Sequence, residues 1–102
     1  MEGLVRQRGS IKASLTNFAK YVSNLLRSDE LLPENVFDLQ ERLNSLECSM
    51  LQRFADIQDK IDRDCDETEL EDEHDERCEF ENKYYKVLAT AKNILANNKK
   101  LL

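Results

Sequence analysis

One segment carries most of the information about the fold: residues 33–61 read PENVFDLQERLNSLECSMLQRFADIQDKI. Apolar side chains recur in it every three or four residues, with a mean spacing of about 3.57 residues, which is close to the period of an α-helix. Pro33 suits the first turn of such a helix, where a missing N–H costs no hydrogen bond. The apolar stripe comprises Val36, Leu39, Leu43, Leu46, Met50, Phe54, Ile57 and Ile61.

A second helix is predicted before this segment, over residues 4–28. Its stripe contains one charged position, Arg8, and is interrupted by Gly9, which disfavours a helix by about 1 kcal/mol relative to alanine. The helix therefore begins either near Gly3 or near Ser10. The apolar members of its stripe are Leu4, Ile11, Leu15, Phe18, Val22 and Leu25.

A third helix is predicted over residues 68–97, after an acidic junction at residues 62–67. Its apolar face begins only at Phe80, and at this spacing Tyr84 faces the core while Tyr85 flanks it. Two possibilities are open for the junction: a turn between separate helices, or one long bent helix.

Together these segments predict an all-α fold: three long helices in an antiparallel, up-down-up bundle or coiled coil. The helices cover roughly residues 4–28, 33–63 and 68–97 of a single domain that spans residues 1–102. With only two glycines and one proline, the chain lacks the turn residues that a β-sheet protein of 102 residues needs.

The charge is strongly uneven along the chain. The net charge of −6 divides into +4 for residues 1–28, −15 for residues 29–82 and +5 for residues 83–102. In an up-down-up bundle the basic start of the first helix lies beside the acidic residues 62–76, which favours this topology. The acidic balance argues against nucleic-acid binding. The apolar runs are too short, and the basic groups too few, for membrane attachment.

Enzymatic motifs are lacking, so we expect a non-enzymatic protein without a cofactor. Two glycines, Gly3 and Gly9, cannot form a phosphate-binding loop or a nucleophile elbow. Three cysteines are an odd number, so at least one stays unpaired within the chain. This count fits a reduced, cytoplasmic protein.

Metal binding is not expected either. The acidic junction places carboxylates at four positions of a calcium loop, but Glu67 stands where that loop requires glycine. His74 and Cys78 are four residues apart on one helix face, with Cys65 nearby, yet no paired cysteine spacing typical of zinc sites supports them. The four carboxylates are Asp62, Asp64, Asp66 and Glu73.

A second, weaker apolar stripe borders the first one on the central helix, and the neighbouring helices carry similar flanking residues. Two interpretations are open. Bundle helices often have wide apolar faces that belong to one core. Alternatively, small bundles often bury additional surface by associating. The candidate oligomer interface consists of Tyr21, Leu26, Phe37, Leu51, Ala55 and Tyr85.

Four short segments suggest a family. Residues 6–18 read RQRGSIKASLTNF, residues 39–43 read LQERL, residues 54–58 read FADIQ and residues 80–85 read FENKYY. In this order they resemble the amino-terminal region of Gag-like polyproteins of BEL/Pao retrotransposons, in which a segment of the type Arg-Gly-x-Ile/Leu-Lys-x-x-Leu-Thr-x-Phe opens the protein. The resemblance covers most of residues 4–88.

That resemblance implies a structural, self-associating segment that precedes a capsid region, in a mobile element or in a host gene derived from one. The zinc knuckle and the protease motif of such polyproteins do not occur in this sequence, so RNA packaging and particle building are not carried over whole. Expected partners are further copies of the chain and other parts of a Gag-like polyprotein. The alternative is a free-standing adaptor similar in size to a spectrin-type repeat, although such a repeat normally carries a tryptophan in its first helix.

Overall fold

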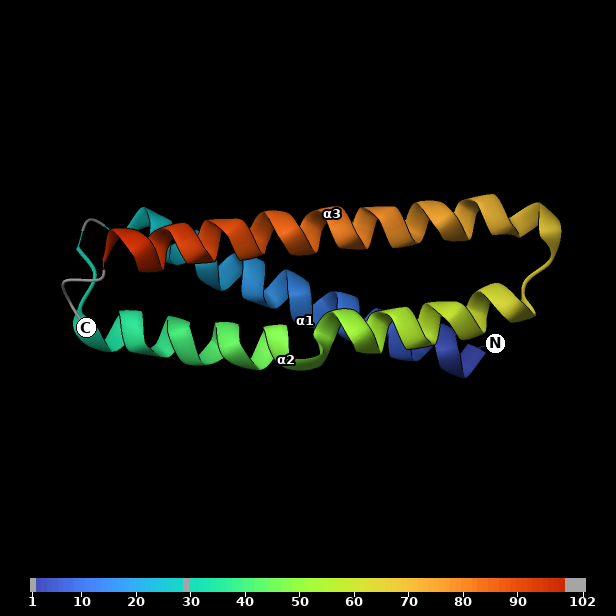
Figure 1. Ribbon diagram of the computed structural model, residues 1–102, viewed down its shortest axis with the longest axis horizontal. Helices are drawn as coiled ribbons and strands as arrows, with labels where there is room; N and C mark the ends of the chain where they lie inside the picture. Colours follow the sequence, from blue (N-terminus) through green and yellow to red (C-terminus); the bar gives the residue numbers. More distant parts are fainter. Residues whose placement is uncertain (1, 29, 99–102) are drawn as a thin grey trace.

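The computed structural model describes residues 2–28 and 30–98, which form three α-helices. The helices α1 (Glu2–Arg27), α2 (Pro33–Asp64) and α3 (Glu67–Asn97) run in alternating directions, as Figure 1 shows. They pack into a rod of 52 × 18 × 16 Å, and the described residues contain no β-strand. The prediction of an all-α bundle of three long helices is confirmed.

The ends of the helices differ from the predicted ones by at most two residues. Helix α1 begins at Glu2 and passes through Gly9 without a break, and a Cβ atom built on Gly9 would meet nothing within 4 Å. The acidic junction is shorter than the predicted residues 62–67, because only Cys65 and Asp66 separate α2 from α3. The second and third helices are therefore separate elements joined by a tight turn.

Local hydrogen bonds explain where α2 and α3 begin. Pro33 is the first residue of α2, as predicted, and the backbone N–H of Leu32 donates to Oδ1 of Asn35 at 3.0 Å. Asp66 precedes α3, and its carbonyl accepts a 2.9 Å bond from the N–H of Glu69. The acidic side chains of this first turn lie at the positive end of the helix dipole, where negative charge is favourable.

The core runs along the whole rod and combines the main stripes of the three helices. Phe54 of α2 stacks on Phe80 of α3 with ring centroids 3.8 Å apart and an angle of 3° between the planes. The prediction for the tyrosine pair is confirmed: Tyr84 is buried and Tyr85 is exposed. Two stripe positions differ from the prediction: Leu4 is only half-buried, and Ile57 is half-buried while its neighbour Gln58 is fully buried.

Candidate interaction surface

The six residues of the candidate interface lie along three different helix pairs. Tyr21 belongs to the contact between α1 and α2: its hydroxyl donates to Oδ2 of Asp38 at 2.6 Å, and the guanidinium of Arg42 lies 4.1 Å from its ring centroid. Burial of the ring and the Asp38 carboxylate raise the pKa of Tyr21 to about 12. Tyr21 therefore takes part in packing within one chain.

Leu26 lies on the side of α1 that faces α3. Two polar contacts mark this side: Lys12 pairs with Glu76 at 2.6 Å, and Lys83 donates to the Thr16 hydroxyl at 2.7 Å. Leu26 follows Lys12 by 14 residues, almost four turns, and so lies close to the same side. Leu26 is 60% exposed and, unlike the other five candidates, lies on the α1–α3 side.

Leu51 and Ala55 lie on the side of α2 that faces α3. They stand between Glu47 and Asp59 in a row of residues four apart, and both carboxylates reach α3. Glu47 pairs with Lys92 at 3.5 Å and Asp59 pairs with Arg77 at 2.6 Å. Both apolar side chains are half-buried, and Leu51 packs against the core.

Tyr85 lies on the matching side of α3. It is eight residues after Arg77 and seven before Lys92, the two cations that reach α2. Its ring meets the buried ring of Tyr84 edge-on, at 5.2 Å between centroids, and 55% of the residue is exposed. Tyr85 thus combines a fixed position with a large accessible surface.

Phe37 completes this row. It precedes Ala55 by 18 residues, which is five helical turns, so both lie on one side of α2. Phe37 is 61% exposed, the largest exposed fraction among the large hydrophobic residues of the described chain. We call the row formed by Phe37, Leu51, Ala55 and Tyr85 the α2–α3 edge.

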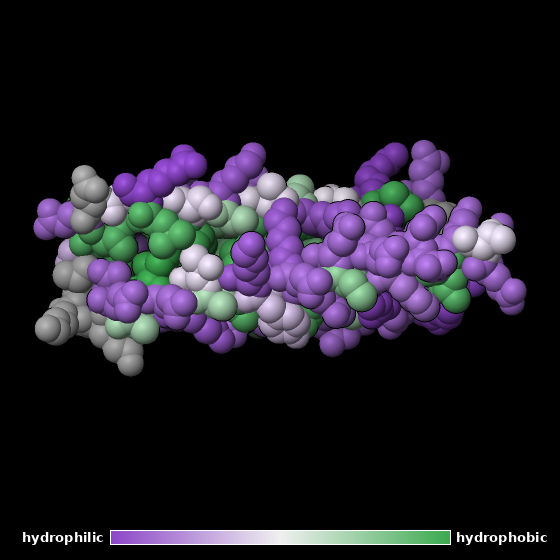
Figure 2. Space-filling view, turned by 90° about the horizontal axis from the view of Figure 1, so that it is seen from above, coloured by the Kyte–Doolittle hydropathy of each residue, from purple (hydrophilic) through white to green (hydrophobic). Residues whose placement is uncertain are grey.

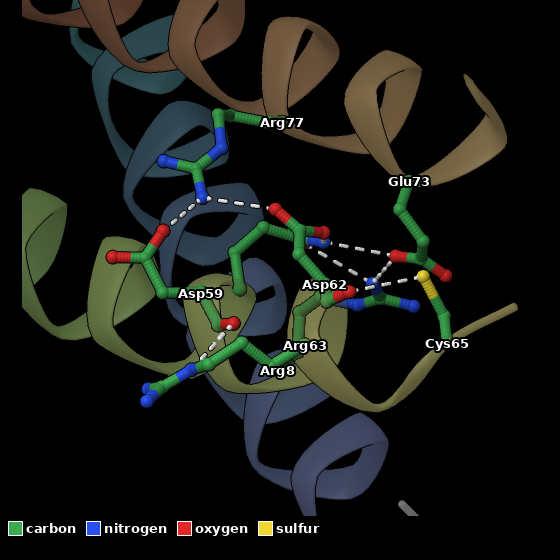
Figure 3. A network of polar contacts seen from close by, with 8 residues as sticks. Arg8, Asp59, Asp62, Arg63, Cys65, Glu73 and Arg77 are labelled. Carbon is green, nitrogen blue, oxygen red and sulfur yellow. Dashed lines mark hydrogen bonds and ion pairs between the residues drawn. The ribbon is translucent and has the colours of Figure 1, made fainter. Parts of the chain in front are cut away.

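A polar layer crosses the core near the α2–α3 turn (Figure 3). Arg8 of α1 forms an ion pair with Glu73 of α3 and donates to Oε1 of Gln58 at 3.2 Å. The amide nitrogen of Gln58 donates in turn to Glu73 and Asp62, both at 2.9 Å. Among the described residues, no buried side-chain nitrogen or oxygen lacks a hydrogen-bond partner. The layer connects all three helices and fixes their mutual register.

The expected proximity of the basic start of the first helix and the acidic residues 62–76 is confirmed by the Arg8–Glu73 and Lys12–Glu76 pairs. Lys12 lowers the pKa of Glu76, chiefly by donating a hydrogen bond to its carboxylate. The sequence contained one hint of the polar layer, because Arg8 occupies a position of the apolar stripe. Nothing comparable indicated Gln58.

Two of the residues that were weighed as metal ligands, Asp62 and Glu73, take part in ion pairs and hydrogen bonds within the chain. Asp62 accepts from Gln58 and pairs with Arg77 at 3.3 Å, and Glu73 pairs with Arg8. Burial and nearby carboxylates raise the pKa of the Cys65 thiol. Within residues 2–28 and 30–98, no three His, Cys, Asp or Glu side chains are grouped as a metal site requires.

The surface of the rod is divided along its length. Seen from above (Figure 2), hydrophilic side chains cover the end that holds the α2–α3 turn, and the largest hydrophobic patch of this view lies toward the opposite end.

None of the helices in the described part of the chain is long and apolar enough to cross a membrane. Comparison of the chain with protein-family models, curated proteins and solved structures found no match.

Proposed function

We propose that the chain is a non-enzymatic self-association domain, and that the α2–α3 edge is the surface through which copies meet. The observation that carries the proposal is the exposure of Phe37 and Tyr85 on the same edge. Aromatic side chains supply much of the binding energy at protein interfaces, because each covers a large area when buried. Leu51 and Ala55 extend the apolar row beyond Tyr85, toward the α2–α3 turn.

The size of the domain also supports association. A bundle of 102 residues buries a smaller fraction of its surface than a larger domain does, and its stability is correspondingly small. Burying the α2–α3 edge against a second copy would add apolar contact without any change of fold. The assignment to a Gag-like polyprotein, with a role in particle assembly, depends on the sequence resemblance alone.

Two exposed residues allow a direct test with a matched control. We expect the unmodified chain to show a concentration-dependent mass above 11.9 kDa in light scattering behind size-exclusion chromatography. Phe37→Glu combined with Tyr85→Glu places two charges in the contact and should return the mass to that of one chain. Leu26→Glu changes an equally exposed leucine on another side of the rod and should leave the mass unchanged.

Circular dichroism distinguishes loss of association from loss of folding. The double variant should keep the helical signal of the unmodified chain, because both side chains project from the rod. Leu51→Glu is unsuitable for this purpose, since Leu51 also packs against the core. An unmodified chain that stays monomeric at every concentration, or a double variant that associates normally, would overturn the proposal.

A groove between α1 and α2 favours a second candidate function, an adaptor that binds a different protein. The groove has a volume of about 520 Å³, and Phe18, Leu46 and Met50 contribute its apolar part. Polar groups of Asn17 and Arg42 border it. A chain that stays monomeric while binding one defined partner protein would support this function instead.

A further inference from the structure

The second halves of α1 and α3 carry only positive charge. Residues 13–28 and 82–98 together contain five lysine and arginine side chains and no carboxylate, whereas residues 62–76 contain ten carboxylates. The two cationic segments are far apart in the sequence, so they form one charged surface only if the fold brings them together.

The fold places these two segments side by side, because α1 and α3 run in the same direction (Figure 1). Two polar contacts set their register: Lys12 pairs with Glu76 at 2.6 Å, and Lys83 donates to the Thr16 hydroxyl at 2.7 Å. The partners in these contacts are 64 and 67 residues apart. Each residue in the second half of α1 therefore lies beside a residue of α3 that is between 64 and 67 positions later in the chain.

Four cations gather where the two segments meet. Lys20 and Lys86 are 66 residues apart, so they lie at the same level of the rod. Lys83 stands about one turn before Lys86 on α3, and Arg27 lies about two turns after the lysine of α1. Leu26, which is 60% exposed, directly precedes Arg27 on the side of α1 that faces α3. We call the surface formed by these five residues the α1–α3 basic patch.

The cations of this patch are available to a ligand. All four are exposed, and none of them takes part in an ion pair among residues 2–28 and 30–98. The fifth cation of the two segments, Lys92, reaches α2, where it pairs with Glu47 at 3.5 Å. A shallow groove of about 290 Å³ follows α1 within the patch, and its lining includes the polar side chains of Thr16, Ser23 and Asn24. The patch therefore combines free cations with hydrogen-bond donors, the groups that carboxylates bind.

We propose that the α1–α3 basic patch binds a short acidic segment of another protein, with one apolar side chain of that segment packed on Leu26. Opposite charges steer the two surfaces together and determine where they meet. Lysine and arginine side chains form charge-assisted hydrogen bonds with carboxylates, and these are stronger than hydrogen bonds between neutral groups. The inference does not depend on the proposed self-association, because the patch lies on the α1–α3 side and leaves the α2–α3 edge uncovered.

The length of the patch favours a short segment over a nucleic acid or a membrane surface. From Thr16 to Arg27 the groove covers about 17 Å of α1, at 1.5 Å per residue. Toward the α2–α3 turn, the same side of α3 carries the exposed carboxylates of Asp75 and Glu79. A DNA duplex has a negative charge about every 1.7 Å, so these carboxylates would repel a duplex that lies along the rod, and equally a flat anionic membrane. A short acidic segment ends before it reaches them.

A synthetic peptide serves as the probe for this patch. It carries a fluorescein label and about twelve residues, mostly glutamate with two leucines, which cover about 18 Å as a helix. Fluorescence anisotropy measures its binding to the unmodified chain. We expect saturable binding that weakens as the salt concentration rises, because ions screen exposed charges. A control peptide with glutamine at every glutamate position should not bind.

Two matched double variants locate the contact. Lys20→Glu combined with Lys86→Glu reverses two charges of the patch, so we expect the dissociation constant of the peptide to rise roughly tenfold. Arg53→Glu combined with Lys60→Glu makes the same change of net charge on α2 and should alter that constant less than about twofold. All four side chains are exposed and unpaired among the described residues, so both variants should keep the helical signal in circular dichroism.

Self-association provides a separate measurement. Phe37→Glu combined with Tyr85→Glu should abolish the association of copies and leave the peptide affinity unchanged, whereas the patch variant should do the reverse. A chain that binds the peptide but stays monomeric contradicts only the proposed function. A chain that associates without binding the peptide contradicts only this inference.

Three results would overturn the acidic segment as the ligand. In the first, the peptide shows no saturable binding, and in the second, the two double variants lose affinity equally. In the third, an oligothymidine of the same length or vesicles that contain phosphatidylserine bind more tightly than the peptide, and Lys20→Glu with Lys86→Glu removes this binding. The patch would then be a site for phosphate groups.

Discussion

Replacing Arg8 by methionine is expected to remove about 3 kcal/mol from the free energy of unfolding, although the change keeps most of the side-chain volume. Arg8 has only 11% of its side chain exposed, and its partner Glu73 has 18%. Breaking a buried ion pair from one side typically costs 3–5 kcal/mol, because the remaining charge is left uncompensated. Glu73 keeps its hydrogen bond from Gln58 and some contact with water, so the lower end of this range applies.

A loss of about 3 kcal/mol corresponds to a fall in melting temperature of roughly 12–24 °C for a domain of this size. Thermal unfolding followed by circular dichroism measures it, at one fixed protein concentration because association also changes stability. Lys12→Met is the matched control: its ion pair with Glu76 is 41% and 32% exposed, so its loss should stay below about 1 kcal/mol.

A double variant tests whether the unpaired charge of Glu73 causes the stability loss of Arg8→Met. Arg8→Met combined with Glu73→Leu removes both charges, so no buried charge is left unpaired, and at least half of the lost stability should return. A loss below about 1 kcal/mol for Arg8→Met, or a double variant that loses the sum of the two single losses, would refute the account of the polar layer.

Three further predictions concern the core, an alkaline titration and helix propensity. Phe54→Ala removes the ring that stacks on Phe80 and should lower the unfolding free energy by about 3–5 kcal/mol in urea denaturation. Tyr21→Phe should remove one of the tyrosine absorbance changes at high pH, the one near pH 12, while the buried Tyr84 still titrates above its ordinary value. Because the folded-state pKa of Tyr21 is raised, its contribution to stability is full below pH 10 and is lost as the pH rises toward 12. A tyrosine spectrum that titrates normally in the unmodified chain would contradict the bond to Asp38. Gly9→Ala should raise the melting temperature, with a gain of about 1 kcal/mol, because Gly9 is helical and the added methyl group meets open space.

Periodicity alone predicted the three helices and their approximate ends. Each stripe arises because one side of an amphipathic helix is apolar, and this pattern can be read from the local sequence. The many apolar residues of α2 made its assignment as a helix clear. The acidic junction was harder, because residues 62–67 contain no glycine or proline to mark a turn, and only the tight turn at Cys65 and Asp66 ends α2.

Contacts between helices could not be predicted in the same way. Between Phe54 and Ile61 the helical period allows either Ile57 or Gln58 in the core, and the apolar residue was the natural choice. Gln58 is buried because Arg8 and Glu73, which are distant in sequence, provide partners for its amide. Arg8 and Glu73 come close to Gln58 only because of the register between the three helices, and the apolar stripe of one helix does not indicate that register.

The same limitation explains why the sequence alone could not tell which residues of the candidate interface lie together on one surface. Its six residues all flank a main stripe, so the spacing of the residues could not separate them into groups. Their distribution depends on how far each helix is rotated about its own axis in the bundle. Tyr21 packs within the chain, Leu26 lies on the α1–α3 side, and four residues lie along the α2–α3 edge. The structure therefore narrows the proposed interface to one side of the rod.

Sedimentation equilibrium of the unmodified chain, over concentrations from micromolar to millimolar, tests the central claim of self-association most directly. The account predicts a reversible increase in mass from 11.9 kDa toward twice that value as the concentration rises. A mass that remains that of a single chain throughout the range would contradict self-association. The α2–α3 edge would then be surface of a monomer and not a contact between copies.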